Sequence, residues 1–420
     1  MRQKYSQLSI FLRQQIAINR LAMLLATIAA SATVGANVEE IDLATANERT
    51  VRVATFNVSL NRRDAGELLS DLSKGSQQAR QVAAILRTVR PDVVLLNEFD
   101  FDESGEALRV FQQQYLEADP GPGSVAPLKY PHSFTALVNT GVPSGVDFNN
   151  DGKTDGPTDA LGFGWFPGQY GMVILSRFPI DRNSVRTFRR LLWKNLPAAA
   201  VPVDPVSGKR WYSTSAWNTL PLSSKSHWDV PVIVAGQRLH LLAAHPTPPA
   251  FDGPEDRNGR RNHDEIRLWA EYISPGDKPW LLDDKGVAGG LPHGRSFVIL
   301  GDLNADPVDG DSYSTAINQL LQHPRVNGDF TPGSDGAIAA AAAQGRANLR
   351  HRGSSRYDTG DFSDSVVGNL RIDYVLPSND VAIKKGAVFW PAPGDDHFDI
   401  ANCSDHHLVW LDLMLPSVSK

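Results

Sequence analysis

The feature that most constrains this chain is a series of β-branched and apolar runs, most of which end in a polar residue followed by a loop. The runs are VRVATFNVSL (51–60), DVVLLNEF (92–99), GMVILSR (171–177), RLHLLAAHP (238–246), SFVILGDLN (296–304), RIDYVLPS (371–378) and HLVWLDLML (407–415). Runs of this composition and length predict buried strands. Their polar ends indicate where the chemistry of the protein lies.

Helical patterns lie between some of these runs. SQQARQVAAILRTVR (76–90) has an apolar face and is followed by Pro91, which stops a helix. The residues of that face are Val82, Ile85, Leu86 and Val89. We also expect helices over 262–273 and 311–322, and a short helix over 337–347.

The N-terminus differs in character from the rest of the chain. Residues 1–20 contain arginine and lysine but no acid, and the apolar stretch LAMLLATIAASATVGA (21–36) follows. Val34, Gly35 and Ala36 are small enough for signal peptidase. We expect residues 1–36 to be a signal peptide and the protein to be secreted or periplasmic. The alternative is an uncleaved anchor, although the apolar stretch is short for a bilayer. No second such stretch occurs, so we expect no membrane span after processing.

Composition narrows the class of protein. The length of 420 residues and a hydrophobic share of 41% predict a globular protein with a large core. The net charge of −6 excludes a global basic field that would draw the protein to nucleic acid. Cys403 is the single cysteine, so no disulfide can form within the chain, which fits a bacterial-type exported protein.

We expect one monomeric domain over 48–417, because no boundary divides the chain after the signal peptide. Segments rich in glycine, proline, serine and aspartate interrupt the strand and helix patterns. These segments, which we interpret as long loops on one scaffold, are 119–168, 190–230, 250–261 and 328–365.

The polar residues at the strand ends form a pattern of their own. In chain order they are Asn57, Glu98, His245, Asp302 with Asn304, Asp373, and Asp405 with His406. Taken singly, Asn57 could be a turn former, His245 a core histidine and Glu98 a helix-cap partner. Charged residues are seldom buried unless they are paired or bind a metal. The joint pattern therefore predicts a functional site.

The chain resembles the endonuclease/exonuclease/phosphatase superfamily of deoxyribonuclease I-like, metal-dependent phosphoesterases. The segments that carry the resemblance are VATFNV, LLNEFD, GQYGMVILSRFPI, LLAAHP, VILGDLNADP, RIDYVL and SDHHLV. It extends from about residue 51 to 415, in blocks separated by the long loops. The resemblance implies an α/β (α+β) fold, a four-layer sandwich of two packed mixed sheets flanked by helices, with the site at one rim.

The resemblance also implies a divalent metal. Glu98 resembles the principal metal ligand of the family, with Asn57 beside it on the metal or the phosphate, and Asp405 is a further candidate ligand. Two oxygen ligands completed by water and substrate suit Mg²⁺. Mn²⁺ or Ca²⁺ are alternatives at the same position.

The remaining motif residues resemble the catalytic residues of the family. Asp302 and Asn304 resemble the pair that orients the attacking water and contacts the phosphate. His406 resembles the histidine at the reacting phosphoryl group, and Asp373 its carboxylate partner. His245 resembles the second histidine, which can donate a proton to the leaving oxygen.

Two positions depart from the family pattern. Some members have a tyrosine two residues before the glycine that corresponds to Gly171, where this chain has Gln169. Tyr170 directly precedes that glycine, and strand alternation would point it to the opposite side. The second departure is His407, which doubles the histidine of the last motif and which we expect to face away from His406.

Two adjacent arginines follow the His245 segment. Arg261 is a candidate for holding the substrate phosphate, because a guanidinium can bind phosphate oxygens bidentately. The alternative is a solvated helix start with Asn262 or Asp264 as the cap. The sequence does not decide between them.

The segment DFNNDGKTDG (147–156), inside the 119–168 insertion, is typical of a calcium-binding loop. Oxygen-bearing residues occupy positions 1, 3, 5 and 9, and Gly152 lies at position 6; these residues are Asp147, Asn149, Asp151 and Asp155. Position 12 is Thr158, where an EF-hand has glutamate, so we expect weak Ca²⁺ binding of about 10⁻⁴ to 10⁻³ M and a structural role. The alternative is an acidic turn without an ion.

These features together favour an exported, divalent-metal-dependent phosphoesterase. The substrate could be nucleic acid, a phospholipid head group or a small phosphate ester, which leaves an extracellular nuclease and a sphingomyelinase-like phosphodiesterase as alternatives. A non-catalytic, calcium-stapled binding module should lack one of the acids or histidines, and none is missing. A calcium-dependent adhesion protein should repeat the acidic loop, which occurs once.

Overall fold

The computed structural model describes residues 49–119, 121 and 125–417. The predicted signal peptide, residues 1–36, lies outside the described residues, and its cleavage stays a prediction. None of the helices in the described part of the chain has the length and apolarity needed to cross a bilayer.

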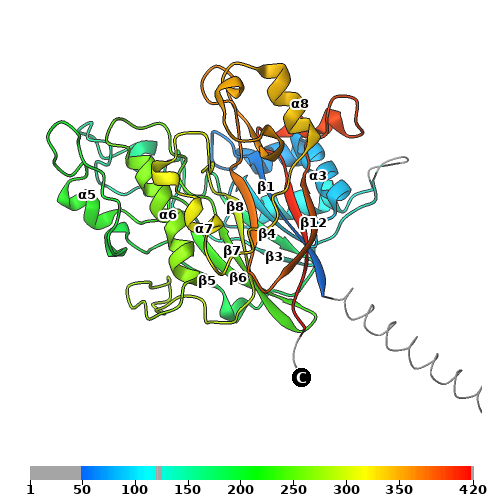
Figure 1. Cartoon of the computed structure of the whole chain (residues 1–420), viewed down its shortest axis with the longest axis horizontal. Coiled ribbons are helices and arrows are strands. Elements are labelled where there is room, and N and C mark those ends of the chain that lie inside the picture. The colour runs from blue at the N-terminus through cyan, green and yellow to red at the C-terminus, as the bar shows by residue number, and fades with distance from the viewer. Residues whose placement is uncertain (1–48, 120, 122–124, 418–420) are drawn as a thin grey trace, which may run out of the picture. The chain divides into compact units, whose positions relative to one another are not determined.

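Two large sheets form the centre of the fold (Figure 1). The six-stranded sheet has the order β12-β13-β1-β2-β4-β3, and its neighbours β1 and β2 are parallel. Its strands are β1 (Thr50–Leu60), β2 (Val93–Phe99), β3 (His132–Phe134), β4 (Met172–Ser176), β12 (Ala382–Val388) and β13 (Val409–Met414).

The five-stranded sheet has the order β11-β8-β7-β6-β5, with β7 and β8 parallel and the other pairs antiparallel. Its strands are β5 (Arg186–Thr187), β6 (His227–Val234), β7 (Gln237–Ala244), β8 (Phe297–Asp302) and β11 (Asp373–Pro377). A two-stranded sheet pairs β9 (Gly360–Asp361) with β10 (Asn369–Leu370).

The helices fall into two groups by type, α-helices and short 3₁₀ or π elements. The α-helices are α2 (Glu67–Lys74), α3 (Gln77–Val89), α4 (Glu106–Phe111), α5 (Thr214–Thr219), α6 (Arg257–Ile273), α7 (Asn318–Leu321) and α8 (Asp335–Gln344). The single-turn elements are η1 (Gln112–Leu116), η2 (Pro157–Asp159), η3 (Arg182–Ser184), η4 (Trp193–Asn195), η5 (Tyr313–Thr315), η6 (Asn348–Arg350), η7 (Ser355–Tyr357) and η8 (Phe398–Cys403).

Side-chain alternation along the strands produces the layers. Alternate β1 residues face opposite ways, so that Val53 joins the core between the two sheets while Phe56 joins the core beneath α3. On the other sheet, Leu241 joins the core between the sheets and Leu242 packs with α6. Figure 1 shows α3 and α6 on opposite sides of the strands. The order helix, sheet, sheet, helix confirms the predicted four-layer α/β sandwich with mixed sheets.

The predicted helices differ in accuracy. The helix expected over 76–90 is α3, where the Ser76 hydroxyl accepts a hydrogen bond from the Ala79 amide and Arg90 ends the helix in a left-handed conformation. The helix expected over 262–273 is α6, which begins earlier, at Arg257. The pattern over 311–322 divides into η5 and α7, because Ser314 is left-handed, with a φ of 49°.

The strand predictions missed elements that carry weaker patterns. β6 begins inside the segment interpreted as a loop and contains Pro231, and β12 is largely exposed. Tyr170 lies in a turn before β4, with a φ of 55°, so strand alternation does not decide its direction. Its amide donates to the carboxylate of Asp100 at 3.0 Å.

Candidate active site

The polar strand ends meet at one edge of the two sheets. Asn57 lies opposite Asn97 in the parallel pair of β1 and β2. Asp302 ends β8 and lies opposite Asp373 in the antiparallel pair of β8 and β11. His245 directly follows β7, the parallel neighbour of β8. Parallel neighbours bring their carboxyl ends to the same edge, which is why residues distant in sequence gather here.

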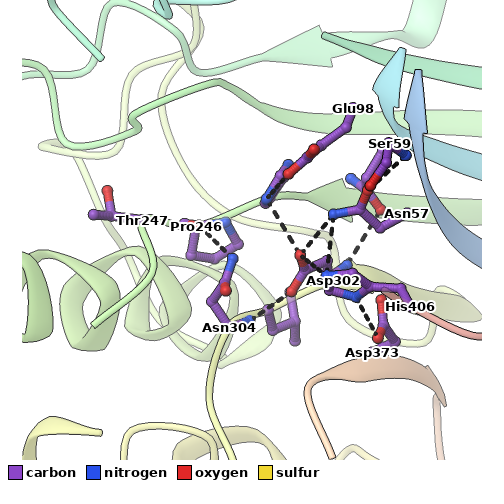
Figure 2. Close-up of polar contacts among 12 residues, drawn as sticks. Asn57, Ser59, Glu98, Pro246, Thr247, Asp302, Asn304, Asp373 and His406 are labelled. Carbon is purple, nitrogen blue, oxygen red and sulfur yellow. Dashed lines mark hydrogen bonds and ion pairs between the residues drawn. The ribbon is translucent and has the colours of Figure 1, made fainter. Parts of the chain in front are cut away.

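Asp302 is the centre of this cluster, as Figure 2 shows. Its Oδ2 accepts a hydrogen bond from Asn57 Nδ2 at 3.1 Å and lies 3.3 Å from His245 Nε2 and 3.7 Å from His406 Nε2. Its Oδ1 accepts from the amide of Asn304 at 3.0 Å. Burial opposes ionisation, but the positive histidines outweigh it and lower the pKa of Asp302. The buried carboxylate is therefore ionised and fully surrounded by donors.

His406 is held as a cation by two carboxylates. Its Nδ1 donates to Asp373 Oδ2 at 2.9 Å, and the Thr359 hydroxyl donates to the same oxygen at 2.8 Å. Burial lowers the pKa of His406, but Asp373 and Asp302 reverse that effect and raise it to about 10. The hydrogen bond to Asp373 fixes the ring so that its Nε2 faces Asp302 (Figure 2).

The neighbouring histidine has the opposite character. His407 is buried and stacks on Trp390, with ring centroids 3.7 Å apart. Burial and the charge on His406 lower the pKa of His407 to about 3, so its ring is neutral. As expected, His407 takes no part in the cluster around Asp302.

Glu98 is the carboxylate of the site that remains partly open to solvent, with a side chain 21% exposed. Its Oε2 accepts from Asn61 Nδ2 at 2.7 Å, and its Oε1 lies 4.0 Å from His245 Nε2. Glu98 has a φ of 60°, a conformation that costs a non-glycine residue energy. Ser59 and Asn304, with φ values of 46° and 52°, are also left-handed. Three residues of this edge therefore adopt a conformation that is uncommon for residues with a side chain.

Buried amides hold the loops of the site in place. The Nδ2 of Asn304 donates to the carbonyl of Pro246 at 3.2 Å (Figure 2). The Nδ2 of Asn262, on α6, donates to the carbonyls of Thr247 at 2.8 Å and Leu303 at 3.0 Å. Asn262 thus joins the His245 loop to the Asp302 loop, and it is not the helix cap that the sequence allowed.

Arg261, the candidate phosphate contact, binds main-chain carbonyls. Its guanidinium is buried and donates to three main-chain carbonyls, those of Leu222, Leu161 and Pro221, at 2.9 to 3.0 Å. These bonds use three of the five N–H donors of the guanidinium and join segments of the long loops, which gives Arg261 a structural role. The alternative, a solvated helix start capped by Asn262 or Asp264, was wrong, because α6 begins at Arg257. The Asp264 carboxylate is buried and accepts a hydrogen bond from Trp193 Nε1 at 2.7 Å.

Lys225 is a charged residue of the site that the sequence patterns did not reveal. It lies just before β6 and is 7% exposed. Burial lowers its pKa, while the carboxylates of Glu265, Glu98 and Asp302 act in the opposite direction. Both oxygens of Glu265 already accept hydrogen bonds, from Ser224 and Thr247. Lys225 is therefore a buried amine within the electrostatic influence of Glu98 and Asp302.

Comparison with known proteins decides the family. A sequence model of the Endonuclease/Exonuclease/phosphatase family matches residues 54–406, most of the chain. The chain belongs to this family. Its members are generally metal-dependent phosphoesterases.

The solved structures similar to this chain carry the names of different proteins. An endonuclease/exonuclease/phosphatase from Beutenbergia cavernae is 20% identical, with 88% of this chain and 73% of that chain covered and a TM-score of 0.46. Sphingomyelinase C from Streptomyces griseocarneus is 16% identical, covering 86% and 99%, with a TM-score of 0.43. TDP2 from C. elegans is 14% identical, covering 87% and 75%, with a TM-score of 0.38. No curated protein matches the chain.

Enzymes of the family use divalent metals. Two groups of residues in the site could hold one, and the group around Glu98 fits a divalent metal better. Its side chain is 21% exposed, and a carboxylate is the ligand that Mg²⁺ prefers. The Oδ1 of Asn57 accepts from the Ser59 amide at 3.2 Å, so one lone pair of that oxygen remains for a metal.

A second group of candidate ligand atoms, from Asp302, Asp373 and His406, lies within 4.8 Å of one another. Here the Nδ1 of His406 and the Oδ2 of Asp373 already bind each other, which makes a protonated ion pair the better description. Asp405 is exposed and accepts from the hydroxyl of Ser59 at 3.2 Å, outside this group.

Proposed function

We propose that the protein is an exported, Mg²⁺-dependent phosphoesterase that hydrolyses a phosphate ester by attack of water. The observation that carries the proposal is the surrounding of Asp302, whose Oδ2 has histidine Nε2 atoms at 3.3 and 3.7 Å. The two imidazoles can donate hydrogen bonds to a phosphate, and the carboxylates of Asp302 and the partly exposed Glu98 are acceptors beside them. Export rests on the basic and apolar N-terminus.

His406 is suited to stabilise negative charge on the reacting phosphoryl group. Its Nδ1–H donates a hydrogen bond to Asp373. The Nε2–H is then the group that can donate a hydrogen bond to a phosphate oxygen. A preorganised cation in a buried site stabilises developing charge more than the same group in water. Lys225 adds a buried amine within the electrostatic influence of Glu98 and Asp302.

Asp302 and His245 are suited to handle the protons of the reaction. The lowered pKa of Asp302 makes it an acceptor that orients the attacking water rather than a strong base. His245, 3.3 Å from Asp302 and 4.0 Å from Glu98, can donate a proton to the leaving oxygen as the bond to phosphorus breaks. A divalent cation held by Glu98, with Asn57 as its neighbour, would neutralise phosphate charge.

The proposal is tested by assaying the purified protein with plasmid DNA, bis-p-nitrophenyl phosphate, p-nitrophenyl phosphate and sphingomyelin. We expect hydrolysis of at least one substrate with Mg²⁺, loss of activity with EDTA, and loss in Asp302→Asn. Glu98→Gln should raise the Mg²⁺ concentration needed for half-maximal activity. A folded wild-type protein that hydrolyses none of the four would contradict a phosphoesterase and favour a binding module. An intact Met1 terminus on protein recovered from cells would contradict export.

A further inference from the structure

The carboxylate of Asp159 has an unusual environment. Asp159 ends the single turn η2 and is 1% exposed. Its Oδ1 accepts a hydrogen bond from the Phe148 amide at 2.9 Å. Its Oδ2 is buried and has no hydrogen-bond partner among the described residues. A buried carboxylate oxygen without a donor is costly, so the oxygen points to a ligand that completes it.

The acidic loop before Asp159 lies next to this oxygen. Phe148, which binds Oδ1, directly follows Asp147. Burial and repulsion from Asp147 and Asp151 raise the pKa of Asp159, so the negative charges of the loop act on the Asp159 carboxylate. Asp151 is exposed, whereas Asp159 closes the inner side of the loop.

Side-chain oxygens of the loop already bind its own main chain. Asp147 accepts hydrogen bonds from the amides of Asn150 at 2.6 Å and Gly152 at 2.9 Å. Asn149 Oδ1 accepts from the Asp151 amide at 3.0 Å. Gly152 has a φ of 84°, which allows the sharp turn that brings the oxygens together. Each of these side-chain oxygens retains a second lone pair for a cation.

We propose that residues 147–159 form a Ca²⁺ site in which Asp159 supplies the carboxylate that the sequence pattern lacks at Thr158. The ligand set is Asp147, Asn149, Asp151, the main-chain carbonyl of Lys153 and Asp159, with water completing the shell. A set of hard oxygens of mixed type suits Ca²⁺, which accepts six to eight of them in flexible geometry. Asp159 lies one position beyond Thr158. The single turn η2 compensates for this shift, because it turns the chain back so that Asp159 contacts Phe148.

The ion would join two loops that are distant in sequence. Asn150 Nδ2 donates to the carbonyl of Trp211 at 3.2 Å, and the Phe148 ring packs edge-on against Tyr212. Fixing the loop therefore also fixes its contact with the segment around Trp211. This site shares no residue with the cluster around Asp302 and does not depend on the proposed function.

The test compares the wild type with Asp159→Asn, using melting temperature with EGTA or millimolar Ca²⁺ and terbium luminescence excited through tryptophan. Ca²⁺ should raise the wild-type melting temperature by about 1 to 3 °C, and terbium should give a signal that Ca²⁺ displaces. Asp159→Asn should lose both. In EGTA it should melt no lower than the wild type, because the substitution removes a buried charge that has no donor. The exposed Asp396→Asn is the matched control and should keep both responses.

Several outcomes would overturn the site. One is a Ca²⁺ shift that persists in Asp159→Asn, and another is a wild type without a shift at 10 mM Ca²⁺. Loss of the shift in Glu98→Gln would locate the ion at the catalytic cluster instead. If Asp159→Asn does not fold, the exposed Asp151→Ala replaces it, and a retained shift in that variant would equally exclude the site.

Discussion

The catalytic cluster and the acidic loop both gather carboxylates, but they neutralise them differently. Asp302 and Asp373 each meet His406, a cation that belongs to the protein. Asp159 accepts one main-chain hydrogen bond, from Phe148, is repelled by the acids Asp147 and Asp151, and keeps one oxygen without a donor. We infer from the comparison that charges of the chain itself maintain the geometry of the cluster, whereas the loop, under the Ca²⁺ proposal, is completed by an added ion.

The largest expected effect follows from removing the protein's own cation. His406→Ala should lower turnover about 10²-fold or more, because electrostatic and acid–base groups of this kind supply that much. The measurement is kcat on whichever phosphate ester the wild type hydrolyses, with circular dichroism to establish folding.

His407→Phe is the matched control, since His407 is neutral and a phenyl ring can keep the stack on Trp390. It should retain turnover within a few-fold of the wild type. A folded His406→Ala protein with near-wild-type turnover would remove His406 from the chemistry.

A smaller effect concerns stability and pH. The pKa of His406 is raised from 6.5 to about 10, so the stability it contributes is fully present below pH 6.5 and is lost as the pH rises through about 10. The melting temperature of His406→Gln should therefore lie below that of the wild type near pH 6.5, by on the order of a few degrees. That gap should close toward pH 10.

For His407→Phe the difference from the wild type should stay constant over the same range, because His407 is neutral throughout. Melting curves of the three proteins from pH 6 to 10 make the measurement. A gap for His406→Gln that does not change with pH would mean that the ring carries no charge in the folded protein.

The fold was largely predictable because buried strands impose a strong pattern. DVVLLNEF and SFVILGDLN are apolar on both faces, and they become β2 and β8 with cores on each side. The start of α6 was not predictable from caps, because Asp256 adopts a left-handed conformation and its side chain makes no cap hydrogen bond. The strand β6 was missed because Pro231 interrupts its pattern.

The site was predictable where it lies on strand ends and not elsewhere. Asn57, Asp302 and Asp373 come together because adjacent strands share an edge. Lys225 and Thr359 lie in loops, and only the folded chain shows that they face the cluster. The structural role of Arg261 was not predictable, because the three carbonyls that bind its guanidinium come from two segments distant in sequence, which no local pattern reveals.

The smallest expected effect separates the two regions most directly. If the loop is only structural, removing its ion should leave catalysis intact as long as the fold persists. Asp151→Ala should therefore have Mg²⁺-dependent turnover within about twofold of the wild type at saturating Mg²⁺ and low temperature, since exposed substitutions away from a site seldom change stability by much. EGTA in excess Mg²⁺ should likewise leave wild-type turnover unchanged, because this chelator removes Ca²⁺ in preference to Mg²⁺.

The measurement is the initial rate at 10 °C and again near the melting temperature, where the variant should inactivate faster. Turnover abolished at 10 °C with an unchanged melting temperature would mean that the loop takes part in catalysis, and the two regions would then have to be treated as one site.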